Sequence, residues 1–462
     1  QNGFFAKLLS LGLIQYLILA NIYMKKDLSK IARQKKIKNF LVSFIDLFGI
    51  QRAKLVPARA ISEMQKTGAG FGGFATYLDL DYDAPDMFAV PDPDSLIQLP
   101  WQQEVGWLAA DLVINNKPMD QCPRVMLKQQ MNKLKESGYF MYTGVECEFF
   151  LITEDGEQIY DSRDTASKPC YDVSALMRRY DVLKEISEAM IYLGWAPYQS
   201  DHEDANGQFE MNWDYSDCLT TADRHVFFKF MVKSIAENHG LRATFMPKPF
   251  KNLTGNGCHA HVSVWTKNKK KNIFLNHKDE LGLSRKGYNF IGGIMKSVDE
   301  FSAWLTPTIN SFERLNARMT DSGSTYSPTA ITYSGNNRTH MIRIPDKGRF
   351  EFRVADGAVN PYLLQASLAA MGRHGMEKNI RPGKRINVNM YTEGKNLKGI
   401  KKLPNSLEAS LRLLTDGKLP KKAFGEKIIN SYEKLKKREM SEYQKSSFAN
   451  RAEWVRQNVI DC

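Results

Sequence analysis

The amino-acid sequence predicts an α+β fold in which a large antiparallel sheet, flanked by helices, has one polar and one apolar face. Four segments alternate polar and apolar residues with the period of a β-strand. Segments with the period of a helix lie between and after them. The chain of 462 residues is 43% hydrophobic and 11% aromatic, which provides a large buried core and excludes global disorder.

The first 36 residues are predicted to form an N-terminal extension. The apolar run Phe4–Tyr23 lacks the basic flank and cleavage site of a signal peptide, and it is barely long enough to span a bilayer. Met24, which precedes Lys-Lys-Asp-Leu, reads as a natural start. We therefore interpret residues 1–23 as upstream or tag-like sequence, with a membrane anchor as the alternative.

Residues 37–120 are expected to form a small β-rich domain. Ile37–Asp46 and Arg52–Pro57 predict a hairpin. The glycine-rich segment Gly68–Gly73 lacks the spacing of a phosphate-binding loop that leads into a helix, so it is interpreted as a flexible loop. Pro85–Pro100 predicts turns and short strands.

Residues 121–462 are expected to form one large domain of strands and helices. Pro123–Ser137 has helical periodicity, and helical spacing returns at Ser406 and continues through Pro420–Arg456. Lys267–Lys271 is interpreted as a solvated, lysine-rich turn between two strands.

The basic residues concentrate at both ends of the chain, whereas the middle is acidic. The formal net charge is +13, and residues 1–60 and 380–462 carry all of the excess. Such ends are more often solvated faces or subunit contacts than a nucleic-acid footprint, so no nucleic-acid partner is expected. Apart from the N-terminal run, no stretch approaches a transmembrane span, so no membrane partner is expected. The six cysteines form no C-x-x-C pair, which excludes a zinc ribbon and favours the reducing cytoplasm.

Four segments place apolar side chains on one side and polar side chains on the other. A sheet with one face in water would explain any single segment, but such faces usually carry Lys, Thr and Ser. Here the polar positions hold mostly Glu, His, Arg, Gln and Asn, so we expect them to line one cavity. The segments are Gly144–Ile152, Gln208–Trp213, Gly257–Trp265 and Arg349–Val354.

A cavity of this kind would contain four glutamates, two histidines and two arginines. Carboxylates do not crowd together in the ionised state without cations among them. Oxygen-rich ligand sets with an occasional imidazole favour Mg²⁺ or Mn²⁺, and arginines beside such metals indicate an anionic substrate. The sequence therefore predicts an ATP-dependent enzyme that uses two or more divalent metal ions without a Walker loop.

The same segments resemble the glutamine synthetase family, in the family's order, over about residues 38–460. The resemblance implies a small β-grasp-like N-terminal domain and a catalytic domain whose curved antiparallel sheet forms a funnel. It also implies a homo-oligomer of stacked rings, a dodecamer or similar, with each active site at a subunit boundary. The motifs are GVECEFF (144–150), HEDANGQFE (202–210), GNGCHAHVS (255–263), NSFERL (310–315), NNRTHMIRIP (336–345) and RFEFRVADGAVNPY (349–362).

The resemblance further implies a set of ligand contacts. One metal ion would be held by Glu148, Glu203 and Glu210, and the other by Glu146, His259 and Glu351. ATP would contact His261, Ser263, Arg343 and Lys347. Glutamate and its acyl phosphate would contact Arg314, Arg353 and the backbone near Gly255, while Arg338 would stabilise the transferring phosphoryl group. The alternatives are a structural ion pair for Arg343 and an ordinary strand position for Ser263.

The implied reaction has two steps. ATP phosphorylates the γ-carboxylate of L-glutamate, and an amine then displaces phosphate from γ-glutamyl phosphate to form an amide. The implied substrates are L-glutamate, ATP and a small amine or ammonia.

Three positions depart from family members that use ammonia. Tyr326 stands where they carry a flap glutamate, Gly72–Tyr77 lacks their aspartate, and Thr254 replaces an asparagine that contacts glutamate. An aromatic residue can hold an alkylated amine by cation–π attraction. We therefore predict methylamine or a similar primary amine as the nucleophile, in line with a similarity to the glutamate–amine ligase, or γ-glutamylmethylamide synthetase, branch.

Glutamine synthesis with ammonia is the alternative, with Asp79, Asp81 or Asp321 in the place of the missing acids. Tyr391 aligns with a tyrosine that some bacterial members adenylylate. Its surroundings match poorly, so regulation there is the weaker hypothesis.

Overall fold

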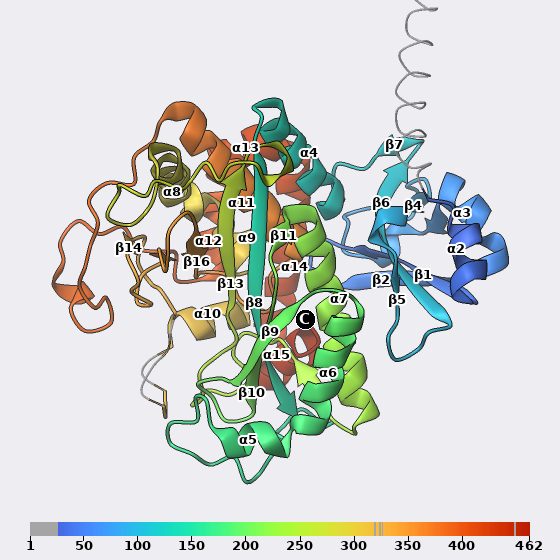
Figure 1. The fold of residues 1–462 in the computed structure, drawn as a ribbon, viewed down its shortest axis with the longest axis horizontal. Helices are drawn as coiled ribbons and strands as arrows, with labels where there is room; N and C mark the ends of the chain where they lie inside the picture. The colour runs from blue at the N-terminus through green and yellow to red at the C-terminus, as the bar shows by residue number, and fades with distance from the viewer. Residues whose placement is uncertain (1–25, 318–319, 323–324, 326, 448–449) are drawn as a thin grey trace, which may run out of the picture. The chain divides into compact units, whose positions relative to one another are not determined.

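Figure 1 presents a computed structural model of the chain, in which residues 26–317, 320–322, 325, 327–447 and 450–462 are described. The chain divides into two compact units. The first lies within residues 1–119, and the second comprises residues 120–462 together with segments 45–50 and 77–79. Each unit has its own sheet.

The first unit contains a seven-stranded sheet with the order β2-β1-β6-β4-β3, to which β5 and β7 add by pairing with β6. Strands β1 and β6 run parallel, whereas β4 is antiparallel to β6. Its elements are α2 (Leu28–Lys35), β1 (Asn39–Ile45), β2 (Gln51–Pro57), α3 (Ile61–Thr67), β3 (Ala69–Phe71), β4 (Met87–Pro91), β5 (Ile97–Gln98), β6 (Val105–Ile114) and β7 (Lys117–Pro118).

The flexible loop expected over Gly68–Gly73 is instead partly a strand. Ala69–Phe71 forms β3 and pairs with β4. Gly68 has a φ of +82°, and a Cβ at this position would lie 2.9 Å from Cβ of Phe88. Glycine is thus required by the backbone conformation and by the close approach of the two strands, and not by flexibility.

The second unit is built on a nine-stranded sheet with the order β14-β15-β16-β13-β8-β10-β9, to which β11 and β12 add by pairing with β8. The four strands predicted from their polar faces are the adjacent strands β16, β13, β8 and β10. The strands are β8 (Phe140–Ile152), β9 (Pro197–His202), β10 (Gln208–Trp213), β11 (Ser216–Asp217), β12 (Arg242–Thr244), β13 (Cys258–Trp265), β14 (Tyr333–Ser334), β15 (Ile342–Arg343) and β16 (Phe350–Phe352). The last is shorter than the Arg349–Val354 predicted.

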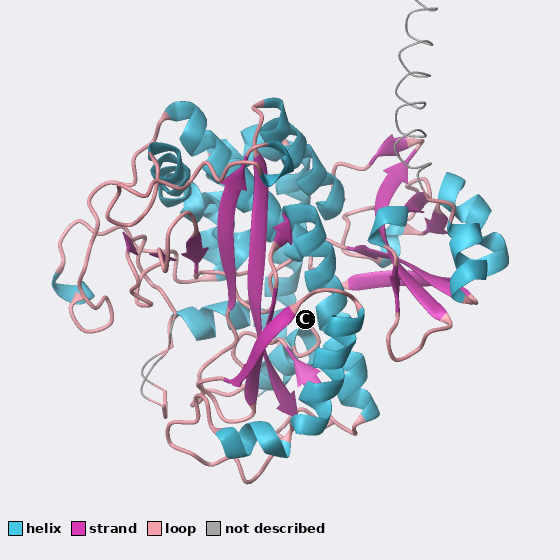
Figure 2. Ribbon diagram, viewed as in Figure 1, coloured by secondary structure: helices cyan, strands magenta, loops and turns pink. Residues whose placement is uncertain are grey.

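Helices pack along this sheet, as Figure 2 shows for the long strands β8 and β13. The helices are α4 (Pro123–Glu136), α5 (Val173–Arg178), α6 (Tyr180–Tyr192), α7 (Cys218–Asn238), α8 (Arg285–Ser297), α9 (Ser302–Leu305), α10 (Ile309–Leu315), α11 (Pro361–Lys378), α12 (Leu407–Asp416), α13 (Lys418–Phe424), α14 (Glu426–Lys445) and α15 (Arg451–Val459). Helix α7 packs against β8 and β12, and Phe228 of this helix meets Phe149 and Phe245 in edge-to-face contacts. This aromatic layer forms the apolar side of the sheet.

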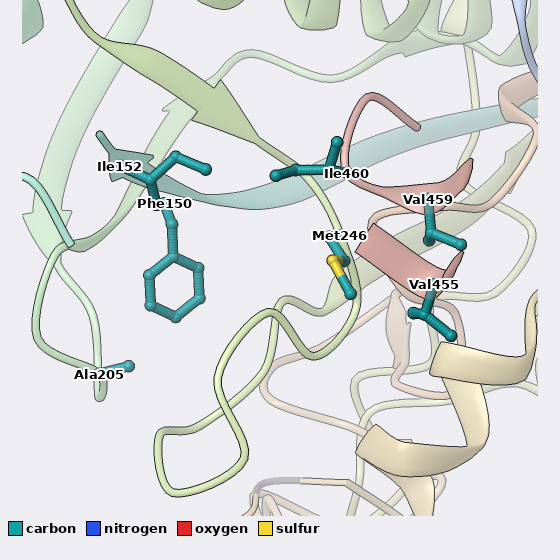
Figure 3. Packing of buried hydrophobic residues seen from close by; sticks show 7 residues of the cluster. All are labelled: Phe150, Ile152, Ala205, Met246, Val455, Val459 and Ile460. Carbon is teal, nitrogen blue, oxygen red and sulfur yellow. The ribbon is translucent and has the colours of Figure 1, made fainter. Parts of the chain in front are cut away.

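The C-terminal helical region is divided into three helices, α13, α14 and α15. Gly425, with a φ of +89°, separates α13 from α14 because this left-handed conformation interrupts a helix. Figure 3 shows Val455, Val459 and Ile460 from the α15 region beside the end of β8, where they share a buried cluster with Phe150 and Ile152.

None of the helices in the described ranges combines the length and the apolar character that crossing a membrane requires.

Candidate active site

The polar side chains of the central strands share one face of the sheet. Glu146 of β8 pairs in register with His259 of β13, and Glu148 of β8 pairs with Glu210 of β10. Directly opposed residues point to the same side of an antiparallel sheet, as do residues two positions apart. Glu203 joins them from the segment directly after β9.

Two groups of three potential metal ligands lie there. Within each group, one ligand atom of every residue lies within 4.8 Å of the others. The groups, here called the glutamate triad and the mixed triad, are Glu148, Glu203 and Glu210, and Glu146, His259 and Glu351. They are the same two sets that the sequence resemblance implied.

The glutamate triad carries repulsion between its own carboxylates. Burial, followed by the charges of Glu148 and Asp201, raises the pKa of Glu203 well above its usual range. Burial and the neighbouring carboxylates, Glu146 first, raise the pKa of Glu210 in the same direction. Hydrogen bonds fix the third member, because Gly257 N donates to Glu148 Oε2 over 2.6 Å. A divalent cation would remove this repulsion, so the donor set fits Mg²⁺ or Mn²⁺.

Histidines adjoin the carboxylates of the mixed triad. Burial acts to raise the pKa of Glu146, but hydrogen bonds with His259 and His261 hold that pKa well below its usual range. His261 Nε2 lies 2.7 Å from Glu146 Oε1. His259 Nδ1 lies 3.4 Å from Glu146 Oε2 and 3.5 Å from Glu351 Oε1, so an imidazole nitrogen and two carboxylates converge on one point, as a metal ion requires.

Two arginines hold Glu351, the second carboxylate of the mixed triad. Arg343 Nη1 donates to Glu351 Oε2 over 2.8 Å, and Arg353 Nη1 donates to Glu351 Oε1. Glu351 is fully buried. Burial opposes ionisation, but the charge of Arg353 lowers the pKa of Glu351. The ion pair considered as the alternative for Arg343 is thus present, and it places this guanidinium beside the metal ligands.

A family model described as "Glutamine synthetase, catalytic domain" matches residues 120–455. The chain belongs to the glutamine synthetase family. It is 54% identical over 438 residues to a glutamine synthetase of Rhizobium leguminosarum bv. phaseoli, which covers 95% of this chain and 100% of that protein. It is 37% identical over 421 residues to the glutamate–methylamine ligase of Methyloversatilis universalis, and the match covers 89% of this chain and 94% of that protein. A solved structure titled "GmaS/ADP complex-Conformation 1" is 52% identical with a TM-score of 0.88, and covers 94% of this chain and 100% of that chain.

These matches confirm the predicted α+β fold class and the family resemblance. Glutamine synthetase family members use ATP and divalent metal ions, and the chain is accordingly an ATP-dependent glutamate–amine ligase. The two triads are its candidate metal-binding groups.

Arg314, which the sequence resemblance assigns to glutamate binding, is a buried side chain with an exposed fraction of 3%. It reaches the metal ligands at Gly257, where an added Cβ would lie 3.0 Å from Arg314 Nη2 and 2.9 Å from Glu148 Oε1. At Gly255, a Cβ would lie 2.2 Å from Pro247 O and 3.2 Å from Arg314 Cγ. Both glycines are therefore needed for the close approach of backbone and site.

Thr254 belongs to a hydroxyl network next to the glutamate triad. Its Oγ1 donates to Asp204 Oδ2 over 2.9 Å and lies 3.2 Å from Thr320 Oγ1 and 3.3 Å from Ser322 Oγ. The flap segment at residues 320–322 is thereby joined to the residue that follows Glu203.

The remaining predicted residues differ in their placement. Ser263 is buried and accepts a hydrogen bond from Trp265 Nε1 over 2.9 Å. Arg338 and Lys347 are exposed side chains. Tyr326 lies outside the described residues.

Sequence reasoning missed residues that adjoin the glutamate triad. Asp201 of β9 pairs in register with Glu210, and burial, then Glu146 and Glu148, raise its pKa to about 6. His202 is fully buried, and its Nε2 lies 2.7 Å from Asp164 Oδ2. The sequence signal for His202 was its position beside Glu203, whereas Asp164 gave none because it is 38 residues away.

Proposed function

We propose that this enzyme ligates L-glutamate to methylamine or a similar small primary amine. The observation that carries the ligase chemistry is the pair of triads side by side on one sheet face, with two arginines on Glu351. The choice of amine is supported by the likeness to the glutamate–methylamine ligase and to the structures titled GmaS, one of them without ligand at 52% identity and a TM-score of 0.87. The departures at Tyr326 and Gly72–Tyr77 favour the same choice.

We assign the glutamate triad to one metal ion and the mixed triad to another. Bound divalent ions would neutralise phosphate oxygens and so make the transferring phosphoryl group electrophilic. The protein's residues supply the remaining parts. His261, Ser263, Arg343 and Lys347 would bind the nucleotide, and Arg314, Thr254 and Gly255 would bind glutamate.

Arg353 and Arg338 would stabilise negative charge that develops on the γ-phosphoryl group during transfer to the γ-carboxylate. Tyr326 would hold the amine beside the acyl phosphate, which the amine then attacks with release of phosphate. The buried walls of the site would limit hydrolysis of this intermediate by water. A ring-shaped homo-oligomer with active sites between subunits, located in the cytoplasm, completes the proposal.

Glutamine synthesis with ammonia is the second candidate. It is favoured by the name of the relative that is 54% identical. Of the acids considered for ammonia binding, Asp79 pairs with Lys434 over 2.7 Å and Asp321 accepts a hydrogen bond from Asn252 over 2.7 Å.

A competition between amines tests the choice. ADP release and amide product are measured with L-glutamate, ATP, Mg²⁺ and, in turn, ammonia, methylamine and ethylamine. We expect the highest kcat/KM with methylamine or another small alkylamine. Glu203→Gln serves as the control for contaminating ATPase, because it removes a proposed metal ligand. A higher kcat/KM for ammonia than for every alkylamine would reject the proposal in favour of glutamine synthesis.

A further inference from the structure

The ammonium group of Lys269 is held between two tyrosine rings. Lys269 Nζ lies 4.5 Å from the ring centroid of Tyr142 and 4.3 Å from that of Tyr215. The two rings meet edge to face at 6.4 Å, and Trp265 packs edge to face on Tyr142 at the same distance. Tyr215 is 45% exposed, so the rings form an open aromatic site that a side chain of the same protein fills.

This aromatic site continues the polar face of the sheet. Tyr142 is paired in register with Ser263 and lies four positions before Glu146 on β8, a separation of about 13 Å along a strand. Between them, Tyr215 packs beside Gly144, since a Cβ at Gly144 would lie 3.4 Å from Tyr215 Cβ, an ordinary van der Waals contact. A nucleotide whose phosphates lie at the mixed triad and whose sugar passes His261 and Ser263 would bring its base to these rings.

The backbone that carries Lys269 is strained. Asn268 and Lys269 have φ values of +58° and +52°, and Lys270 N donates to Lys267 O over 3.4 Å. This is the geometry of a type I′ turn, whose second central position is usually glycine. A lysine at that position has a conformational cost that a glycine would avoid, and a functional role of its side chain would account for that cost.

We propose that Lys269 sets the nucleotide affinity of the enzyme by competing with the purine base for the faces of Tyr142 and Tyr215. An ammonium group and a flat base both bind the face of an aromatic ring, and they cannot occupy it together. Binding of ATP then requires release of Lys269 from the rings. The inference rests on the proposed nucleotide site and adds a residue that lowers affinity for the base without contacting the phosphates.

Nucleotide binding to the full chain tests this competition. Calorimetry in the presence of Mg²⁺ measures the affinity for ADP and for pyrophosphate, which has no base. The proteins compared are the native protein, Lys269→Gly and the control Lys270→Ala, which changes the same turn. We expect Lys269→Gly to bind ADP about 5-fold more tightly or better, since each cation–π contact at an exposed site corresponds to about 2- to 5-fold in a binding constant. Pyrophosphate affinity and the Lys270→Ala variant should stay unchanged.

A double-mutant cycle adds a second measurement. Tyr142→Leu should weaken ADP binding, and the gain from Lys269→Gly should shrink in its presence, because the same ring is lost. An unchanged or weaker ADP affinity in Lys269→Gly, or an equal gain for pyrophosphate, would overturn the inference. If the native protein binds no ADP at all, the proposed nucleotide site itself is wrong and the inference falls with it.

Discussion

Glu148 of β8 lies directly opposite Glu210 of β10, and both side chains are buried. Two buried carboxylates in register repel each other in the absence of a cation, and Glu203 adds a third. The carboxylates that bind the metal ion therefore lower the stability of the metal-free fold at this point of the sheet.

Glu210→Gln should separate these two effects. Loss of one charge relieves repulsion, so the Tm in EDTA should rise or stay equal, while Mn²⁺ affinity should fall by at least about 10- to 100-fold. Thermal melts with and without Mn²⁺, and calorimetry, measure both. Glu188→Gln on α6, whose partner is the exposed Lys184, is the matched control. A lower Tm in EDTA with unchanged Mn²⁺ affinity would argue against the metal assignment.

The stability of the metal-free protein should fall as the pH rises. The pKa values of Glu203 and Glu210 are raised by folding, and that of Asp201 is raised to about 6. The folded state therefore binds protons more tightly than the unfolded chain, and this stabilisation is lost as pH rises through the raised pKa values. Tm in EDTA should decrease from about pH 5 to about pH 8, whereas saturating Mg²⁺ should flatten or reverse the slope because it binds the ionised carboxylates. A metal-free Tm that increases over this window would contradict the prediction.

Arg353→Gln should destabilise the protein as well as inactivate it. The change removes one of the two positive charges that neutralise the fully buried Glu351. Removing a partner from a buried ion pair costs about 3–5 kcal/mol of stability, and the remaining ion pair with Arg343 reduces this loss. The double variant Arg353→Gln with Glu351→Gln should recover most of the free energy of unfolding and none of the activity. Urea unfolding and ADP release provide the two readouts. Equal losses of stability in the single and double variants would show that the pair is not the cause.

Gly257→Ala should impair metal binding more than stability. The added methyl group would lie 2.9 Å from Glu148 Oε1 and His259 Nε2, one ligand from each triad. We expect weaker Mn²⁺ binding and a lower kcat with a modest change in Tm. Gly70→Ala, where the nearest atom is 3.5 Å away, is the control. Native Mn²⁺ affinity in Gly257→Ala would mean that the glycine is not needed for ligand placement.

The period-2 pattern predicted the four central strands and their polar faces, because alternation in a strand is a local property of the backbone. It also placed Glu146 and Glu148 on one side. The interpretation of Gly68–Gly73 as a flexible loop was wrong, because glycine there permits a close strand pairing. The helical period correctly predicted helix within Pro420–Arg456, but it did not indicate that Gly425 separates α13 from α14. Hydrophobic period alone does not reveal either outcome.

Local patterns in the chain thus specified the ligand types, their sides of the strands and, through the motifs, the family. Three contacts became visible only in the folded chain: Asp201 lies beside the glutamate triad, Asp164 contacts His202, and Lys269 lies over the tyrosine rings. These contacts depend on register between strands and on the paths of loops and turns. Both are set by packing of the whole domain, so no local spacing in the chain encodes them.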